Sequence, residues 1–174
     1  QKMVERHLSR RGIADSRVLD AMRSVPRERF VAPGMEEFAY EDSPLPIAEG
    51  QTISQPYIVA HMIEAAELEP DDRVLEVGTG SGYAAAVMSR VAGTVFTIER
   101  HRALGAEARE RLQASGYANV HVRIGDGSKG WPDEAPFDAI IVAAGGPAVP
   151  VALKEQLEIG GRLVMPVARP EGEQ

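Results

Sequence analysis

The chain has 174 residues, of which 44% are hydrophobic and 26% charged, a balance typical of one soluble globular domain with a sizeable core. It contains no cysteine, so disulfides, thiolate metal sites and cysteine nucleophiles are excluded. The formal net charge of −7 disfavours nucleic acid as a partner. Because the longest uncharged stretch, residues 139–153, is too short for a membrane helix and the charged N-terminus has no apolar signal core, we expect no membrane partner and a cytoplasmic location.

Two helices are predicted at the start of the chain. Apolar residues at helical spacing predict a first helix over residues 4–11, which Gly12 ends. Asp15 and Ser16 are candidate N-caps of a second helix, which Pro26 ends. This part of the chain therefore has helical rather than strand character.

A long loop and a third helix follow. Residues 31–56 are rich in proline and glycine, and long ordered loops in compact domains are often functional. The third helix is expected from about Pro56 to Leu68. The residues expected on its inward face are Ile58, Val59, Met62, Ile63 and Ala66.

From residue 73 onward, short apolar runs alternate with helical patterns. The expected strands are 73–77, 94–98, 120–124, 137–142 and 162–167, and the expected helices are 83–91, 103–115 and 150–157. This alternation predicts an α/β fold, a Rossmann-like doubly wound and mostly parallel sheet with helices on both faces. Its ligand cleft lies at the carboxyl ends of the strands. We interpret the chain as a single domain in which residues 1–70 carry the helices and a substrate loop, and residues 71–174 form the cofactor-binding core.

A glycine loop follows the first strand of this core. Residues 76–82 are Glu-Val-Gly-Thr-Gly-Ser-Gly, and glycine lets the backbone approach a ligand closely. Glu99 ends the second strand, about 20 residues after Gly78, where an acidic side chain can accept hydrogen bonds from ribose hydroxyls. Together the two features predict an adenosine cofactor.

The positions of the glycines and of Glu76 indicate which kind of adenosine cofactor the loop binds. The dinucleotide fingerprint needs a third glycine where this chain has Tyr83. Glu76 suits a cationic group such as an amino-acid ammonium, and adenosine joined to an amino acid is S-adenosylmethionine. Asp126-Gly127 follows the third strand and is expected to contact the adenine amino group, although an Asp-Gly pair is also a common turn. The cofactor-binding residues predicted in this way are Glu76, Gly78, Thr79, Gly80, Ser81, Gly82, Glu99, Asp126 and Gly127.

These residues give the chain a resemblance to the protein-L-isoaspartate O-methyltransferase family of class I S-adenosylmethionine-dependent methyltransferases. Residues 50–56 (Gly-Gln-Thr-Ile-Ser-Gln-Pro) are the family-specific segment, whereas residues 74–83 are shared by many methyltransferases. The segments that support the resemblance are residues 125–127, 137–142 and 160–167. The resemblance implies methylation of the α-carboxylate of L-isoaspartyl, and more weakly D-aspartyl, residues in damaged peptides and proteins, which starts their repair. It also implies that Ser54 is the active-site serine, that Thr52 and Ile53 border the cofactor, and that Thr52, Ser54 and Gln55 border the substrate.

Ser54 also has a local interpretation. It stands just before a helix, where free N–H groups can hold a carboxylate, and the alternative is that it only caps that helix. A peptide carboxylate is ionised at neutral pH, so the reaction requires no general base. The four histidines show no metal-ligand spacing, so no metal is expected.

Family members continue beyond the fifth strand, whereas this chain runs from Gln1 to Gln174, so we expect it to be a piece of a longer polypeptide. Three other functions stay open: a methyltransferase of a small molecule or RNA, a truncated cofactor-binding domain without turnover, and an NAD oxidoreductase, which Tyr83 disfavours. The sequence does not indicate the oligomeric state.

Overall fold

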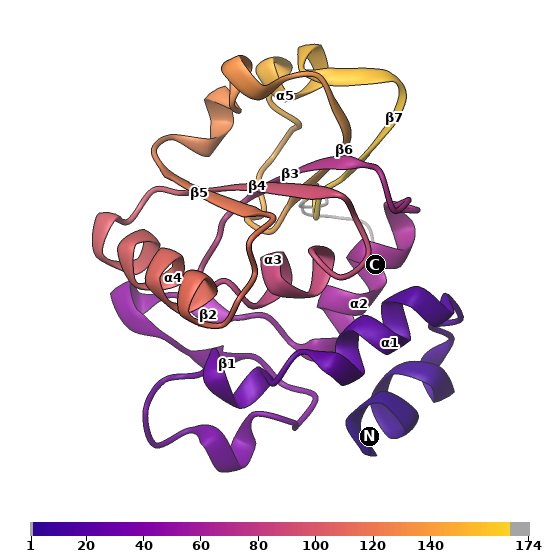
Figure 1. The fold of residues 1–174 in the computed structure, drawn as a ribbon, viewed down its shortest axis with the longest axis vertical. Helices are drawn as coiled ribbons and strands as arrows, with labels where there is room; N and C mark the ends of the chain where they lie inside the picture. The colour runs from indigo at the N-terminus through magenta and orange to yellow at the C-terminus, as the bar shows by residue number, and fades with distance from the viewer. Residues whose placement is uncertain (1, 168–174) are drawn as a thin grey trace, which may run out of the picture.

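The structure is a computed structural model that describes residues 2–167. Its centre is a five-stranded parallel sheet with the strand order β5-β4-β3-β6-β7 (Figure 1). In chain order the strands are β3 (Arg73–Val77), β4 (Thr94–Glu99), β5 (Val120–Ile124), β6 (Phe137–Val142) and β7 (Leu157–Val164). The expected alternation of strands and helices is confirmed. The terminal residues Gln1 and 168–174, which bear on the expectation of a longer polypeptide, lie outside the described part.

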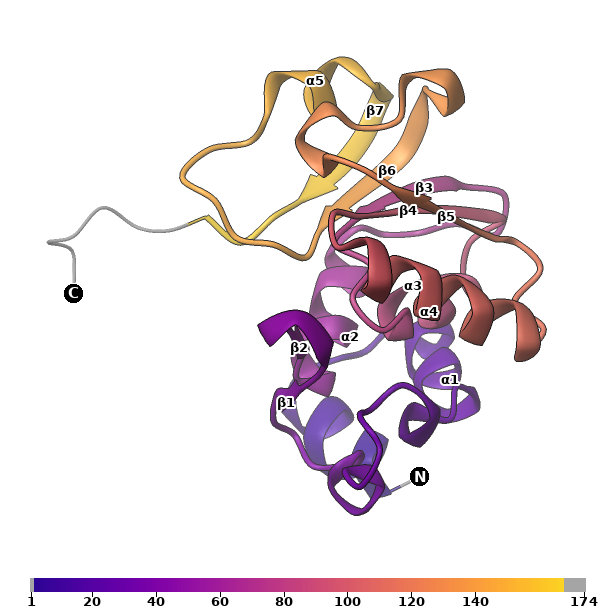
Figure 2. The ribbon, with the colours of Figure 1, turned by 90° about the vertical axis from the view of Figure 1, so that its left-hand side faces the viewer.

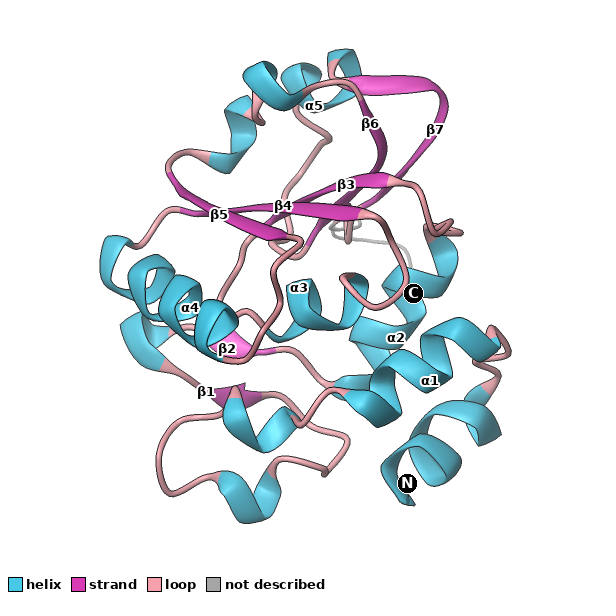
Figure 3. Cartoon of the chain, viewed as in Figure 1, coloured by secondary structure: helices cyan, strands magenta, loops and turns pink. Residues whose placement is uncertain are grey.

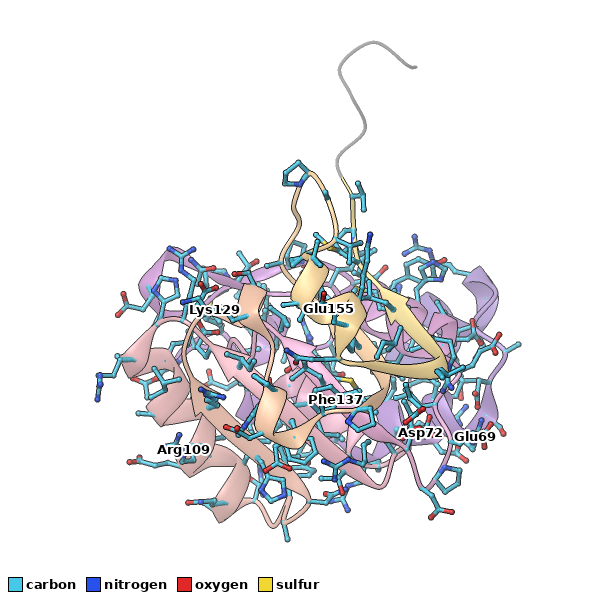
Figure 4. The ribbon with its side chains drawn as sticks, turned by 90° about the horizontal axis from the view of Figure 1, so that it is seen from above. Glu69, Asp72, Arg109, Lys129, Phe137 and Glu155 are labelled. Carbon is cyan, nitrogen blue, oxygen red and sulfur yellow. The ribbon has the colours of Figure 1, made fainter. Side chains whose placement is uncertain are left out.

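Helices cover both faces of the sheet (Figures 2 and 3). On one side lie α1 (Ser16–Ser24), α2 (Pro56–Ala65), α3 (Tyr83–Met88) and α4 (Arg102–Ala114), and on the other lies α5 (Val151–Glu155). Figure 4 looks down on the α5 side, with Glu155 and Phe137 near the middle of the view. Short helical turns span Val4–Leu8, Ser9–Arg11, Arg27–Arg29, Glu36–Phe38, Ala48–Gly50, Gly127–Lys129 and Pro132–Glu134. A small antiparallel ladder joins β1 (Leu45–Pro46) and β2 (Thr52–Ile53).

Two apolar clusters hold these layers together. Successive residues of a strand face opposite sides. Val74 accordingly packs into a cluster with the N-terminal helices, whereas Leu75 packs with Phe96, Phe137 and Leu153 of α5. Because Leu8 and Met22 belong to the same cluster as Val74, the N-terminal segment shares its core with the sheet.

The N-terminal elements largely follow the sequence. The Asp15 carboxylate accepts hydrogen bonds from the backbone N–H groups of Arg17 at 2.8 Å and Val18 at 3.4 Å, so the predicted N-cap is confirmed. Gly12 ends the preceding turns with a φ of 98°, a conformation that favours glycine.

Other boundaries differ from expectation. The helix after the glycine loop ends at Met88 rather than residue 91, and α2 ends at Ala65 rather than Leu68. The last strand begins at Leu157, which pairs with Phe137 beside an irregularity in the ladder, and ends three residues before the expected position 167. Ile58 was expected to face inward but is 40% exposed, because the helix buries Val59 and Ile63 instead.

The topology places a cleft at one end of the sheet. The chain passes from β3 to β4 on one side, and β6 pairs with β3 on the other. The loops that leave β3 and β6 therefore diverge at their carboxyl ends, which is where doubly wound sheets bind ligands. Within residues 2–167, no helix has both the length and the apolar character needed to cross a lipid bilayer.

Candidate functional site

The glycine loop turns sharply at the end of β3. Its three glycines, Gly78, Gly80 and Gly82, have φ values of 98°, 55° and 95°, in the region that side chains disfavour. The Gly78 N–H donates to the Ile98 carbonyl at 2.9 Å, and a Cβ on Gly78 would lie 3.4 Å from that of Ala143. The loop is thus held tightly between the ends of β4 and β6.

A cavity of about 170 Å³ separates this loop from the segment that contains Ser54. Nine predicted site residues line it: Thr52, Ile53, Ser54, Glu76, Gly78, Thr79, Gly80, Ser81 and Glu99. Six further residues line the cavity and were not predicted as site residues: Gln51, Val59, Tyr83, Ala84, Ala143 and Ala144. The cavity brings together residues from four parts of the sequence, between Gln51 and Ala144.

Glu76 is the most unusual group in this cavity. Its side chain is fully buried, and the register of β3 and β4 places Thr97 beside it. The Thr97 hydroxyl donates a hydrogen bond to Glu76 Oε1 at 2.6 Å. Glu76 Oε2 has no hydrogen-bond partner among the described residues. Burial raises the pKa of Glu76 to about 8, the Glu99 charge acts in the same direction, and the Thr97 hydrogen bond opposes both. A cationic group at Oε2 would supply the missing partner.

Two hydroxyls extend this polar wall. Thr79 and Thr97 share a buried hydrogen bond of 2.6 Å between their Oγ1 atoms. Ser81 Oγ is buried and has no partner within residues 2–167, while the Ser81 carbonyl accepts a hydrogen bond from Arg111 Nη1 at 2.8 Å. The residues therefore fit the amino-acid end of S-adenosylmethionine, since its ammonium and carboxylate can satisfy such buried polar atoms.

A second cavity, of about 340 Å³, adjoins the first at Gly78 and Glu99. Glu99 lies between the two cavities and is 4% exposed, and its carboxylate accepts from the N–H groups of Gly80 and His101, each at 2.9 Å. Apolar side chains, among them Ile98 and Val142, complete the second cavity. Its place beside Glu99 fits the adenosine end of the same cofactor.

Asp126 and Gly127 line this second cavity. Asp126 Oδ1 accepts hydrogen bonds from the hydroxyl of Ser128 at 2.7 Å and from its N–H at 3.0 Å, and these bonds lower the pKa of Asp126. Asp126 thus forms a turn and also borders the cavity. A Cβ on Gly127 would lie 2.4 Å from Val77 Cγ1, so this backbone passes too close to β3 for a side chain.

Two predicted site residues do not line either cavity. Gly82 begins α3, and a Cβ there would lie 3.1 Å from Leu112, so its role in the structure is to let α3 and α4 pack. The Gln55 side chain donates to Asp42 Oδ2 at 2.9 Å. The structure thus gives Gly82 and Gln55 packing and loop contacts, and their contacts with cofactor and substrate stay predictions.

Ser54 lines the first cavity together with Glu76. The N-cap residue of α2 is Gln55, whose side chain makes no capping bond. Asp42 Oδ1 instead accepts a hydrogen bond from the Tyr57 N–H in the first turn at 3.0 Å, so helix capping does not account for Ser54. The Ser54 carbonyl accepts a hydrogen bond from Arg27 Nη2 at 2.9 Å. Sequence reasoning missed this arginine, because a single Arg in a helical turn carries no pattern that predicts burial.

The histidines have other surroundings. His61 stacks on Tyr57 and His121 on Phe96, whereas His101 lines the second cavity. Within residues 2–167, no group of three His, Cys, Asp or Glu side chains could hold a metal ion.

Comparison with known proteins shows the family of this chain. The model of the family "Protein-L-isoaspartate(D-aspartate) O-methyltransferase" matches residues 1–174. Protein-L-isoaspartate O-methyltransferase 2 of Pelobacter propionicus is 62% identical over 165 residues, which are 95% of this chain and 73% of that protein. A solved protein-L-isoaspartate O-methyltransferase has a TM-score of 0.88 at 36% identity, over 95% of this chain and 54% of its own. A Plasmodium falciparum protein described by the same name, solved in complex with S-adenosyl-L-homocysteine, has a TM-score of 0.81 at 26% identity, over 98% of this chain and 84% of its own. The chain therefore belongs to the protein-L-isoaspartate (D-aspartate) O-methyltransferase family.

Proposed function

We propose that this chain transfers a methyl group from S-adenosylmethionine to the free α-carboxylate of L-isoaspartyl residues, and more weakly of D-aspartyl residues, in damaged peptides and proteins. Esterification of that carboxylate starts the repair of the damaged residue. The observation that carries the proposal is that the Ser54 segment and the buried Glu76 border one cavity. This arrangement supports a site in which a cationic cofactor and an anionic acceptor meet.

The cofactor-binding residues have separable tasks. We assign the amino-acid end of the cofactor to Glu76 and Ser81, because their buried oxygens lack partners within the described chain. Glu99 is assigned to the ribose. Its Oε2 accepts one hydrogen bond from the glycine loop and its Oε1 accepts one from His101, so each oxygen keeps a second lone pair for a ribose hydroxyl. Asp126 Oδ2 is assigned to the adenine amino group, because Oδ1 already forms the turn.

Acceptor binding is assigned to the Ser54 segment of the first cavity. When bound, S-adenosylmethionine supplies a sulfonium methyl group for an in-line displacement. Thr52 and Ser54 have the task of orienting the ionised carboxylate toward that methyl group, so no side chain needs to remove a proton. Holding two reactants in line and excluding water can reduce the barrier by several kcal/mol.

The direct test compares two peptides that differ only in L-isoaspartate against L-aspartate at one position, with labelled S-adenosylmethionine. Label in the isoaspartyl peptide alone is the expected result. Label in neither peptide, while S-adenosylhomocysteine still binds in a calorimeter, would contradict the acceptor assignment and favour a cofactor-binding domain without this turnover.

Ser54→Ala tests the acceptor wall. We expect turnover of the isoaspartyl peptide to fall about tenfold or more, because the carboxylate loses an orienting hydroxyl, while affinity for S-adenosylhomocysteine stays within about twofold. The matched control is Ser24→Ala, at the end of α1, where the hydroxyl bonds only the Ala21 carbonyl. Unchanged turnover in Ser54→Ala would remove the serine from the site.

A further inference from the structure

Arg27 is a buried cation directly behind the wall of the first cavity. Its side chain is 0% exposed, although it lies in the short turn Arg27–Arg29 that follows α1. Nε donates to the Ala39 carbonyl at 2.7 Å, and Nη2 donates to the Ser54 carbonyl at 2.9 Å. The guanidinium carbon lies 4.7 Å from the centre of the Tyr83 ring.

This environment leaves the charge without a direct ion pair, and the Asp42 carboxylate acts on it from further away. Arg27 takes part in none of the ion pairs within residues 2–167, and its Nη1 is buried without a hydrogen-bond partner there. A buried charge without a paired carboxylate destabilises a fold, and well-packed apolar residues of similar volume are often at least as stable. Packing alone therefore does not explain an arginine at this position.

Two of the three groups that Arg27 contacts connect it to the site. Ser54 and Tyr83 both line the first cavity, so the guanidinium is in contact with the residues of the cavity wall without lining the cavity itself. Its third partner, Ala39, belongs to the long loop before β1. The planar guanidinium thus ties this loop to the backbone of the Ser54 segment with two bonds in a fixed geometry.

We propose that Arg27 is a positioning residue for the acceptor carboxylate, because it fixes the backbone at Ser54 and places behind it a positive charge that no carboxylate pairs directly within residues 2–167. A carboxylate bound at Ser54 is then favoured by that charge, since the low-polarity surroundings screen it weakly. This inference rests on the proposed function and deepens it. Among the described residues, Arg27 makes no hydrogen bond to Glu76 or to the glycine loop, and its contact nearest to that side of the cavity is the Tyr83 ring.

The kinetic test uses Arg27→Lys and Arg27→Met. The lysine variant keeps the charge but loses the two-pronged geometry, and the methionine variant loses both. We expect kcat/KM for the isoaspartyl peptide to fall about tenfold in Arg27→Lys and about a hundredfold in Arg27→Met, while the dissociation constant of S-adenosylhomocysteine changes less than about twofold. The matched control is Arg29→Lys, in the same turn but exposed, for which kcat/KM stays unchanged.

A double-mutant cycle separates positioning from general support of the fold. If Arg27 acts through Ser54, Arg27→Lys lowers kcat/KM much less in the Ser54→Ala background than in the unmodified chain. Equal losses in the two backgrounds would overturn the proposal. So would a loss of S-adenosylhomocysteine affinity as large as the loss of kcat/KM, because that result means the whole cavity has been disturbed.

A measurement without substrate keeps the inference testable even if Arg27→Met does not fold. Amide hydrogen exchange at residues 53–57 is expected to be faster in Arg27→Lys than in the unmodified chain, with exchange in β3 unchanged. Unchanged exchange at 53–57 would overturn the positioning role while leaving the proposed function standing. An unmodified chain that binds S-adenosylhomocysteine but methylates no isoaspartyl peptide would overturn the proposed function and this inference with it.

Discussion

Replacing Glu76 with glutamine should change how the stability of the free protein depends on pH. The pKa of Glu76 is raised from 4.5 to about 8, chiefly by burial. Between these two values the folded protein keeps a proton that the unfolded chain has released, so stability falls as the pH rises. The slope is about 1.4 kcal/mol per pH unit, and the accumulated loss is about 5 kcal/mol by the time the pH passes 8. Below pH 4.5 the contribution of this proton is fully present.

The assay is urea unfolding of the protein without ligand from pH 5 to pH 9. Because glutamine is neutral at every pH and close in shape, Glu76→Gln is expected to flatten the decline in unfolding free energy and to be the more stable protein at pH 8 and above. Glu107→Gln, the same change at an exposed position of α4, serves as the control and should retain the original slope. Parallel pH profiles for the unmodified chain and Glu76→Gln would refute this reasoning.

The same group couples cofactor binding to protons. A cationic ammonium beside Glu76 favours the carboxylate, so binding lowers its pKa and releases a proton. With a free-state pKa of about 8, about nine tenths of a proton should be released at pH 7 and little at pH 9. Calorimetry with S-adenosylhomocysteine in buffers of different ionisation enthalpy measures this number, and proton uptake at pH 7 would contradict the assigned orientation.

Other substitutions test the loops around the site. Gly82→Ala should destabilise the fold more than Gly116→Ala, because both glycines have positive φ but only a Cβ at Gly82 would lie 3.1 Å from Leu112. Urea unfolding of the two variants measures the difference, and equal losses of unfolding free energy would count against the contact. Gly127→Ala should lower the stability of the fold by about 1–3 kcal/mol and also weaken binding of S-adenosylhomocysteine, because its Cβ would lie 2.4 Å from Val77. Unchanged affinity in calorimetry would show that the backbone adapts. Asp15→Ala should cost about 1 kcal/mol of unfolding free energy through the lost N-cap and leave turnover unchanged.

Structural features that depend mainly on one local physical effect were predicted correctly from the sequence. Parallel strands buried on both faces are rich in apolar residues, as in the run Ala139–Val142 of β6, and the limits of β3 and β6 were predicted at Arg73–Val77 and Phe137–Val142. The glycine loop was predictable because its positive φ values exclude most side chains. Asp15 was predictable because an N-cap depends on its nearest neighbours alone.

The sequence-based predictions were wrong or incomplete where contacts with residues far away in the sequence determine the structure. The start of β7 at Leu157 depends on pairing with Phe137, which no local pattern contains. Ile58 is apolar and at helical spacing, yet it lies beside the small space next to Ser54 rather than in the core. The role of Arg27 depends on carbonyls at Ala39 and Ser54, which the fold alone brings to it.

The unsatisfied polar groups of the free protein point to one place. Within residues 2–167, the buried side-chain atoms without a hydrogen-bond partner are Arg27 Nη1, Glu76 Oε2 and Ser81 Oγ. Two of these residues line the first cavity and the third contacts its wall through Ser54 and Tyr83. Each such atom destabilises the fold by about 1–3 kcal/mol, more where it carries charge, so they would not be expected to gather by chance. A cofactor ammonium at Glu76 and an acceptor carboxylate on the Arg27 side would together offset this destabilisation. The groups that destabilise the free protein are therefore the ones that gain most when both ligands bind.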